Sequence, residues 1–274
     1  MPEPSATTPV VPTTSTQYEL RDRAAWIRLT RPEKKNAIGP DVLAGIADGL
    51  DRSLEDGARS VVITGSGGVF CAGADLAHVL GGLDDLSGIE ALLEDAGQLM
   101  RRIEQHPLPV IAAVDGIAMA GGLELLLACD IVIATTEARL ADGHANYGLF
   151  PGAGATVRLP RRIGDARAKY LMFTGLPATA EAMREAGLVN QVVAPDALEA
   201  TVRQLCGRLA QTSGEGIARM KRVVDESWNL TTEDALAAEL DAAREHLRSA
   251  DVAEGLAAFA EGRRPDFNQT RGAA

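Results

Sequence analysis

The feature that most constrains the fold of this chain lies near its middle. It is a strand, followed by a turn and by a helix that begins with glycines. The apolar run from Leu108 to Val114 is typical of a buried strand. The pair Gly121-Gly122 then begins an apolar helix, with Glu124 in its first turn. The first N–H groups of a helix lack partners within the helix and lie at the positive end of its dipole. This junction could therefore hold a negatively charged oxygen, with a carboxylate nearby for proton transfer.

Apolar runs and amphipathic stretches predict alternating strands and helices on both sides of this centre. Strands are expected over residues 18–20, 24–29, 60–64, 131–134, 139–141 and 188–193. Helices are expected over residues 41–55, 89–105, 166–173, 180–186, 198–210, 216–228, 232–247 and 252–259, the second-last with Thr231 as a cap. This succession favours an α/β fold of parallel ββα units over an all-β fold, with a helical layer in the C-terminal third.

Composition and charge argue against several classes of protein. The net charge of -11 disfavours a general nucleic-acid binder, which would need a basic face. Cys71, Cys129 and Cys206 lack metal-ligand spacing and suit a reducing compartment, so no metal site is expected. No apolar run reaches the length of a membrane span, and the N-terminus lacks the pattern of a signal peptide. We therefore expect a cytoplasmic protein that does not interact with membranes.

Three loops carry further candidate residues. The loop Arg31–Asn36 contains cations that could meet an anionic ligand, with a solvated turn as the alternative. The small residues of Phe70–Leu76 allow close backbone approach, but no Gly-Lys-Ser/Thr follows, so a phosphate-binding loop is not expected. The third loop contains His144 and is followed by the tight turn Pro151–Gly154.

In their order and separations these motifs resemble those of the crotonase, or enoyl-CoA hydratase/isomerase, family. The resemblance rests on residues 31–38, 70–76, 110–130, 149–154 and 186–190. It extends from Tyr18 to about Phe267. It implies a ββα-spiral core and an acyl-CoA thioester substrate, as in fatty-acid metabolism, so that coenzyme A is part of the substrate and no separate cofactor is needed. It also implies homotrimers, or hexamers made of two trimers.

The resemblance further suggests how the chain is divided. We expect a disordered tail over residues 1–16, which are rich in Pro, Thr and Ser. An acyl-CoA-binding ββα-spiral core is expected over residues 17–195, and a helical C-terminal oligomerisation region over residues 196–274.

By motif position, the resemblance implies an oxyanion hole made by the backbone N–H groups of Ala74 and Gly121. Such donors stabilise the charge that a thioester oxygen gains as the acyl group becomes enolate-like. Glu124 matches the first catalytic glutamate of the hydratases and could act as a general base. The alternative role for Glu124 is to complement the dipole of its helix.

The second hydratase glutamate is the point at which this chain departs from the family. Counting without gaps from Glu124 to the Pro151–Gly154 turn, its position is occupied by His144. A histidine can also exchange protons, and its ordinary pKa of about 6.5 is closer to neutrality than that of glutamate. His144 is therefore a candidate catalytic residue, with a substrate-shaping or a structural role as alternatives.

The resemblance also suggests residues that lie along the substrate and its coenzyme A portion. These are Lys34, Lys35, Ala72, Asp75 and Leu76. Family contacts in the lysine loop are often made by backbone, so the two lysine charges could contribute only steering or attraction of phosphate. For His78, His106 and His246 we favour structural roles.

These observations lead to three hypotheses. The first is an enoyl-CoA hydratase-like lyase in which Glu124 activates water and His144 exchanges the proton at the α carbon. The second is another reaction of the same family, double-bond isomerisation or acyl-CoA hydrolysis, which the histidine in place of the second glutamate makes realistic. The third is an acyl-CoA-binding protein without catalytic activity, against which the retention of Glu124 argues.

Overall fold

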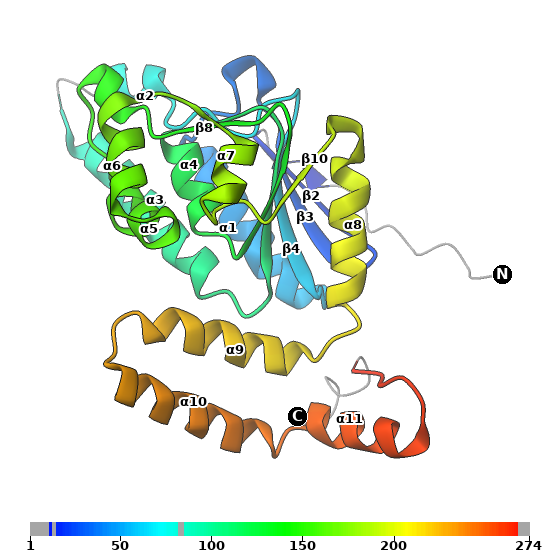
Figure 1. The fold of residues 1–274 in the computed structure, drawn as a ribbon. Helices are drawn as coiled ribbons and strands as arrows, with labels where there is room; N and C mark the ends of the chain where they lie inside the picture. The colour runs from blue at the N-terminus through cyan, green and yellow to red at the C-terminus, as the bar shows by residue number, and fades with distance from the viewer. Residues whose placement is uncertain (1–10, 13–14, 82–84, 268–274) are drawn as a thin grey trace.

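The computed structural model describes residues 11–12, 15–81 and 85–267, which form a mixed α/β fold with two sheets (Figure 1). The larger sheet has the strand order β1-β2-β3-β4-β5-β7-β10, and the smaller has the order β6-β8-β9. The strands of the larger sheet are β1 (Val11–Pro12), β2 (Thr16–Arg21), β3 (Ala24–Leu29), β4 (Ser60–Gly65), β5 (Val110–Val114), β7 (Ile131–Thr135) and β10 (Gln191–Val193). Those of the smaller sheet are β6 (Ile117–Met119), β8 (Arg139–Ala141) and β9 (Ala178–Thr179).

The predicted parallel arrangement is confirmed in the centre of the larger sheet. From β3 through β4, β5 and β7 to β10 all neighbours pair in parallel, whereas β2 pairs with β3 antiparallel. After β5 the chain enters the smaller sheet through β6 and then forms α4 (Gly121–Leu127). This strand–strand–helix succession is the expected ββα unit, and it places the start of α4 beside the carboxyl end of a central strand.

Both faces of the central strands are buried because helices cover each of them. Along β5, Ala112 packs in the main core, and its neighbours Ile111 and Ala113 pack in a second cluster on the opposite face. The main core contains residues of α1 (Pro40–Glu55) and α3 (Ser87–Glu104), and the second contains residues of α8 (Leu198–Leu209). A strand buried on both faces reads as a continuous apolar run, which is why β5 was recognisable in the sequence.

The remaining helices complete the main core and form a separate layer. Around the core lie α2 (Leu76–Gly81), α5 (Ala155–Ile163), α6 (Asp165–Thr174) and α7 (Ala180–Glu185), with short 3-10 turns η1 (Pro32–Lys34), η2 (His144–Tyr147) and η3 (Pro195–Ala197). The layer consists of α9 (Gly214–Ser227), α10 (Thr232–His246) and α11 (Ala250–Glu261), below the sheet in Figure 1. The predicted cap of α10 is confirmed, because the Thr231 hydroxyl accepts a hydrogen bond from the Asp234 N–H.

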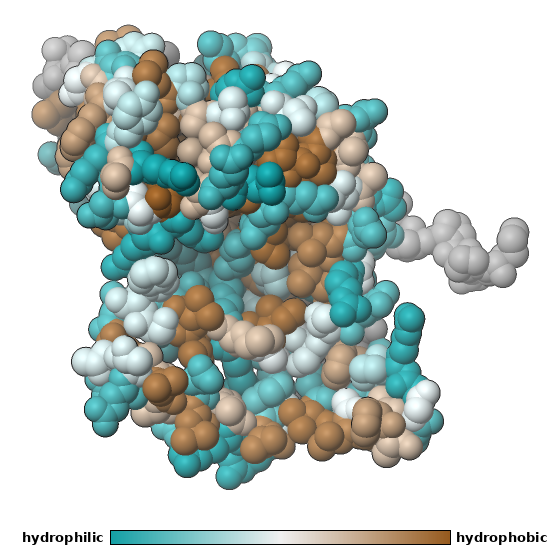
Figure 2. Space-filling model, in the orientation of Figure 1, coloured by the Kyte–Doolittle hydropathy of each residue, from teal (hydrophilic) through white to brown (hydrophobic). Residues whose placement is uncertain are grey.

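The C-terminal layer carries large apolar side chains on its surface. Figure 2 shows hydrophobic residues gathered along its lower edge. Exposed apolar residues of α10 and α11 include Leu236, Leu240, Leu256 and Phe259, the last 86% exposed. Such a face is typical of a helical layer that contacts another subunit, and the trimeric or hexameric state stays a prediction.

Two boundaries of the predicted division differ in the structure. Val11–Pro12 pair with Gln17–Tyr18, so the sheet already begins inside the stretch expected to be a disordered tail, residues 1–16; residues 1–10 and 13–14 lie outside the described residues. The helix α8 was assigned to the region 196–274, but its Leu198, Val202 and Cys206 pack on the sheet. The C-terminal layer therefore starts with α9, after the last helix that covers the sheet.

Candidate active site

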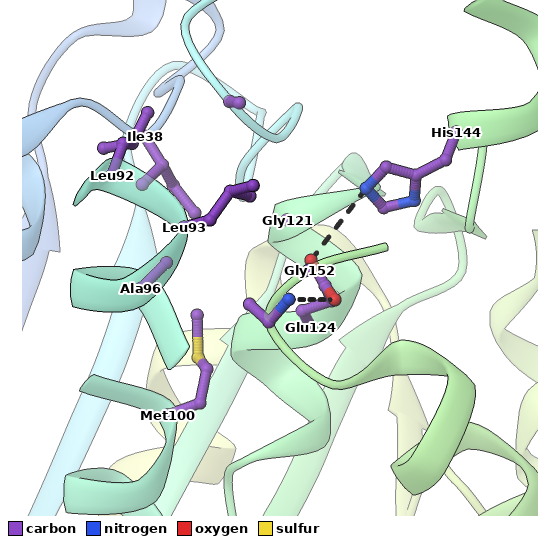
Figure 3. A pocket seen from close by; sticks show the side chains of 11 residues that line it. Ile38, Leu92, Leu93, Ala96, Met100, Gly121, Glu124, His144 and Gly152 are labelled. Atoms are coloured by element: carbon purple, nitrogen blue, oxygen red, sulfur yellow. Dashed lines mark hydrogen bonds and ion pairs between the residues drawn. The ribbon is translucent and has the colours of Figure 1, made fainter. Parts of the chain in front are cut away.

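Segments distant in the sequence meet at the start of α4. Ile38 forms a parallel bridge with Ala74, and Cys71 forms another with Ala118. The motif at residues 70–76 therefore contacts both the motif at residues 31–38 and the motif at residues 110–130. A cavity of about 60 Å³ opens there. It is lined by Ile38, Ala74, Leu92, Leu93, Ala96, Met100, Gly121, Glu124, His144, Gly152 and Ala153 (Figure 3). The structure thus brings the four predicted oxyanion and catalytic residues into one pocket.

The backbone directs the N–H groups of Ala74 and Gly121 away from neighbouring strands. The Ile38 N–H donates to Gly73 O at 2.7 Å, and the Asp75 N–H donates to Ile38 O at 2.9 Å. Because successive backbone groups alternate along an extended chain, the Ala74 N–H between them points to the other side. The Gly121 N–H is one of the donors in the first turn of α4 that have no partner within the helix.

An unusual backbone conformation precedes Gly121. Ala120, the N-cap of α4, has φ 49° and ψ -119°, a region that L-residues rarely occupy. Its N–H donates to Ala141 O at 3.0 Å, and its carbonyl accepts from Glu124 N at 3.0 Å. These bonds hold the turn that takes the chain from β6 into α4 and sets the direction of the Gly121 N–H.

Glu124 is fixed through one of its carboxylate oxygens. Its Oε1 accepts hydrogen bonds from the backbone N–H groups of Ala153, at 2.8 Å, and Ala155, at 3.0 Å. The side chain is 4% exposed, and its burial raises the pKa of the carboxyl although both N–H groups and His144 act in the opposite direction. The other oxygen, Oε2, faces His144 (Figure 3).

His144 faces Glu124 within the pocket, at the start of η2. Its Nε2 is 3.9 Å from Glu124 Oε2, and its Nδ1 is 3.1 Å from Asp142 Oδ1. Burial lowers the pKa of the imidazole, but the hydrogen bond and charge of Asp142, together with the charge of Glu124, outweigh burial and raise it. The arrangement stabilises the protonated ring.

The opposite wall of the pocket is apolar. Leu92, Ala96 and Met100 are spaced by four residues on α3 and therefore share one face of that helix. Met100 is fully buried, and Leu93 reaches over the pocket toward Gly152. Sequence reasoning did not assign this wall, because an apolar helix face that lines a cavity has the same pattern as one that fills a core.

Five predicted substrate-binding residues do not line the cavity. They are Lys34, Lys35, Ala72, Asp75 and Leu76. The loops that carry them are joined, since the Ala72 N–H donates to Lys35 O at 3.0 Å. The Asp75 carboxylate is 2.9 Å from Arg31 Nη2 and 3.8 Å from Lys34 Nζ, so it organises the cations of this loop. A role of these residues toward coenzyme A stays a prediction.

The sequence motifs did not select two supports of the catalytic pair. The first is Asp142, which is 1% exposed and contacts the imidazole of His144. The signal was its place two residues before His144, but no motif selected it. The second is the pair of N–H groups of Ala153 and Ala155 that hold Glu124. The sequence of a glycine-containing turn does not indicate which of its backbone N–H groups will bind a distant side chain.

The other described histidine of the core has a structural role. His106 is 5% exposed; its Nδ1 accepts from the Leu108 N–H at 3.3 Å, and its Nε2 lies 3.3 Å from Leu50 O. Burial lowers its pKa.

Among residues 11–12, 15–81 and 85–267, no group of His, Cys, Asp and Glu could hold a metal ion, and no helix is long and apolar enough to cross a membrane.

Comparison with known proteins agrees with this geometry. The sequence model of the enoyl-CoA hydratase/isomerase family matches residues 20–270. The chain belongs to this family. A crotonyl-CoA hydratase of Syntrophomonas wolfei is 36% identical over 253 residues, which cover 91% of this chain and 96% of the relative. A 1,2-epoxyphenylacetyl-CoA isomerase of Escherichia coli is 36% identical over 247 residues, which cover 88% of this chain and 93% of the relative.

Solved structures of the family share the fold. The crystal structure of an enoyl-CoA hydratase from a Polaromonas species superposes with a TM-score of 0.87 and 31% identity, over 91% of this chain and 98% of that one. An enoyl-CoA hydratase from Bacillus anthracis gives a TM-score of 0.85 and 33% identity, over 94% of this chain and 97% of that one. The predicted crotonase-type fold is confirmed.

Proposed function

We propose that this member of the enoyl-CoA hydratase/isomerase family adds water to a 2-enoyl-CoA thioester through an oxyanion-stabilised enolate. The observation that carries the proposal is the 3.9 Å separation of Glu124 Oε2 and His144 Nε2 at the wall of an apolar pocket. Two proton-exchanging groups at this separation leave room for a shared water rather than a direct hydrogen bond. The same pocket contains Ala74 and Gly121, whose N–H groups are the expected oxyanion donors.

In the proposed reaction, the thioester oxygen accepts hydrogen bonds from the N–H groups of Ala74 and Gly121. Glu124 takes a proton from water, and the water oxygen forms a bond to the β carbon. The electron pair of the double bond moves to the α carbon and the thioester oxygen as an enolate, which the two donors stabilise. His144 then gives its Nε2 proton to the α carbon.

The two groups return to their starting states by moving one proton. After the reaction Glu124 is protonated and the imidazole of His144 is neutral. Transfer of the proton from Oε2 to Nε2, which are 3.9 Å apart, restores the carboxylate and the imidazolium through one intervening water. The ordinary pKa of histidine is above that of glutamate, and the raised pKa of His144 favours this direction, whereas the raised pKa of Glu124 opposes it.

Double-bond isomerisation is the second candidate. Isomerases occur among the relatives: that of Escherichia coli, named as an isomerase of the epoxide 1,2-epoxyphenylacetyl-CoA, is as identical to this chain as the Syntrophomonas wolfei relative, at 36%. Removal of a proton by Glu124 and return of a proton by His144 would move a double bond without addition of water. The same residues therefore serve both reactions, and the product distinguishes them.

The experiment is to incubate the protein with 2-enoyl-CoA and 3-enoyl-CoA esters of short, long, branched and cyclic acyl groups and to separate the products by chromatography. We expect 3-hydroxyacyl-CoA from at least one 2-enoyl ester, formed roughly 10²–10⁴-fold more slowly by the Glu124→Gln variant. Interconversion of 2-enoyl and 3-enoyl esters alone would favour the isomerase. Free coenzyme A would indicate hydrolysis, and unchanged esters that still bind would indicate a protein without catalytic activity.

A further inference from the structure

Asp142 lies behind His144, on the side of the imidazole ring opposite to Glu124. Its Oδ1 is 3.1 Å from Nδ1 of His144. On the other side of the ring, Nε2 is 3.9 Å from Glu124 Oε2, the contact drawn as a dashed line in Figure 3. Asp142 is 1% exposed and is not among the residues that line the cavity. It is therefore placed to act on the imidazole and not on a bound ligand.

The glycine between Asp142 and His144 allows their side chains to meet although they are only two residues apart. After β8 ends at Ala141, Gly143 has φ 71°, in the left-handed region that favours glycine. A Cβ at this position would lie 3.0 Å from Met119 Cγ, so a side chain would also meet the neighbouring strand. The sharp turn at Gly143 brings the Asp142 carboxylate and the His144 ring together.

A role in shaping the loop does not account for a carboxylate here. Asp142 Oδ1 also accepts a long bond of 3.3 Å from the backbone N–H of His144, which an asparagine oxygen could accept equally well. Its Oδ2 is buried and has no hydrogen-bond partner among the residues that the structure describes. Burial of a carboxylate is costly unless it is paired, and the imidazolium of His144 is the positive charge that it contacts.

We propose that Asp142 is a positioning residue, which holds the Nδ1–H of His144 and leaves Nε2 as the only ring atom that exchanges a proton with the substrate. The catalytic consequence of this inference rests on the proposed function. The hydrogen bond between Asp142 and the Nδ1–H of His144 does not, because it belongs to the protein without substrate. When the imidazolium gives its Nε2 proton to the α carbon, the neutral ring keeps its other proton on Nδ1, bonded to Asp142. The ring then presents the Nε2 lone pair toward Glu124, ready to receive the next proton.

The test combines two variants at one position. Asp142→Leu removes the acceptor and keeps the branched shape of the side chain, whereas Asp142→Ala removes the acceptor together with everything beyond Cβ. The ring protons of the histidines are observed by nitrogen-15 NMR at a pH at which His144 is neutral, and its signal is assigned with His144→Gln. We expect the Nδ1–H form in the natural protein, and loss of that form in both Asp142→Leu and Asp142→Ala.

Kinetics gives a second measurement. We expect kcat for the preferred 2-enoyl ester to fall roughly 10–100-fold in Asp142→Leu with KM changed less than about threefold, because Asp142 does not line the pocket. In a His144→Gln background the same change should have no further effect on kcat.

The outcomes separate this inference from the proposed function. An Nε2–H form of neutral His144 in the natural protein would overturn the inference, as would an equal loss of kcat in the presence and absence of His144. If Asp142→Leu does not fold, retention of the Nδ1–H form in the folded Asp142→Ala variant would also count against it. Failure to hydrate any enoyl ester, with Nδ1–H still observed, would remove the proposed function and leave the Asp142–His144 pair established.

Discussion

Glu124 Oε2 and His144 Nε2 lie 3.9 Å apart, and each side chain is held from behind by a different part of the chain. The N–H groups of Ala153 and Ala155 hold the carboxylate, and Asp142 holds the imidazole. Neither group needs the other for its position. The gap between them is therefore a property of the fold, and it is wide enough for a shared water.

Replacement of Glu124 by glutamine should abolish most turnover without loss of the fold. The amide oxygen can still accept from Ala153 and Ala155, but an amide cannot take a proton from water. General-base catalysis typically contributes about 10²–10⁴-fold, so we expect kcat to fall by that factor with little change in binding. Steady-state kinetics and calorimetric titration with a non-reactive acyl-CoA check this, and normal turnover would remove Glu124 from the mechanism.

Gly121→Ala tests the proposed oxyanion hole. A Cβ at this position would lie 3.6 Å from Ala74 N and 3.3 Å from Ile38 Cδ1, between the two proposed donors. Gly121 does not have a positive φ, so the methyl group obstructs the site without backbone strain. We expect kcat/KM to fall by about 10²–10³-fold, the usual effect of losing one oxyanion donor.

The matched control for that substitution is Gly207→Ala in α8. A Cβ there meets nothing within 4 Å, and alanine in a helix is favoured over glycine by roughly 0.5–1 kcal/mol. The control should keep full activity and unfold at the same or a higher temperature. Equal activity of the Gly121→Ala and Gly207→Ala proteins would exclude Gly121 from the oxyanion hole.

His144→Glu should not by itself produce a two-glutamate hydratase. The new carboxylate would lie close to the Asp142 carboxylate, which is 1% exposed and now contacts the imidazole at 3.1 Å. Like charges in such a site oppose each other, so we expect loss of activity and a lower unfolding temperature. Addition of Asp142→Asn should recover at least about tenfold in kcat by removing the repulsion. A single His144→Glu variant that is stable and fully active would contradict this explanation.

The pH dependence of kcat should show both limbs displaced upward. The base Glu124 must be ionised, and burial raises its pKa above the ordinary 4.5. The midpoint of the acid limb should therefore lie above pH 4.5. The acid His144 must be protonated, and its raised pKa places the alkaline limb above pH 6.5. A pH–rate profile measures both limbs, and His144→Gln should remove the alkaline one. An alkaline limb below pH 6.5 would be inconsistent with His144 as the acid.

Asp225 in α9 should make stability depend on pH. Its pKa is raised from 3.8 to about 6, first by partial desolvation of the carboxyl group and then by the charge of Asp130. Between those pH values the folded protein binds a proton that the unfolded chain does not, so stability falls as the pH rises through this window. At pH 7.5 Asp225→Asn should stabilise the protein by about 1 kcal/mol, after allowance for screening at this exposed residue, and at pH 3.5 the effect should vanish. Unfolding curves at both pH values check this, and an equal gain at each would argue against titration of Asp225.

The sequence predicted the central part of the fold because its signals there are local and strong. The continuous apolar run of β5 and the amphipathic pattern of α1 gave the elements nearly to their ends. The helix α5 was missed because Pro160 lies inside it, and β6 was missed because it is three residues long beside a glycine turn. Short elements of this kind depend on pairing with distant segments, which no local pattern records.

For the site, the motifs predicted which residues meet but not how they are held. Ala74, Gly121, Glu124 and His144 do line one pocket. The buried position of Asp142 and the bonds from Ala153 and Ala155 depend on turns at glycines, whose direction is set by tertiary contacts. The apolar wall on α3 was equally invisible, since a periodic apolar face does not indicate whether it meets a side chain or a substrate.

The most direct test of the central claim is isotope incorporation from heavy-oxygen water. The protein is incubated with the 2-enoyl-CoA ester that it prefers, and the product is analysed by mass spectrometry with fragmentation of the acyl group. We predict a single heavy oxygen at the β carbon with the thioester intact, and incorporation roughly 10²–10⁴-fold slower with Glu124→Gln. Heavy oxygen in a released carboxylic acid, or rearranged product without any heavy oxygen, would contradict hydration at the Glu124–His144 pair.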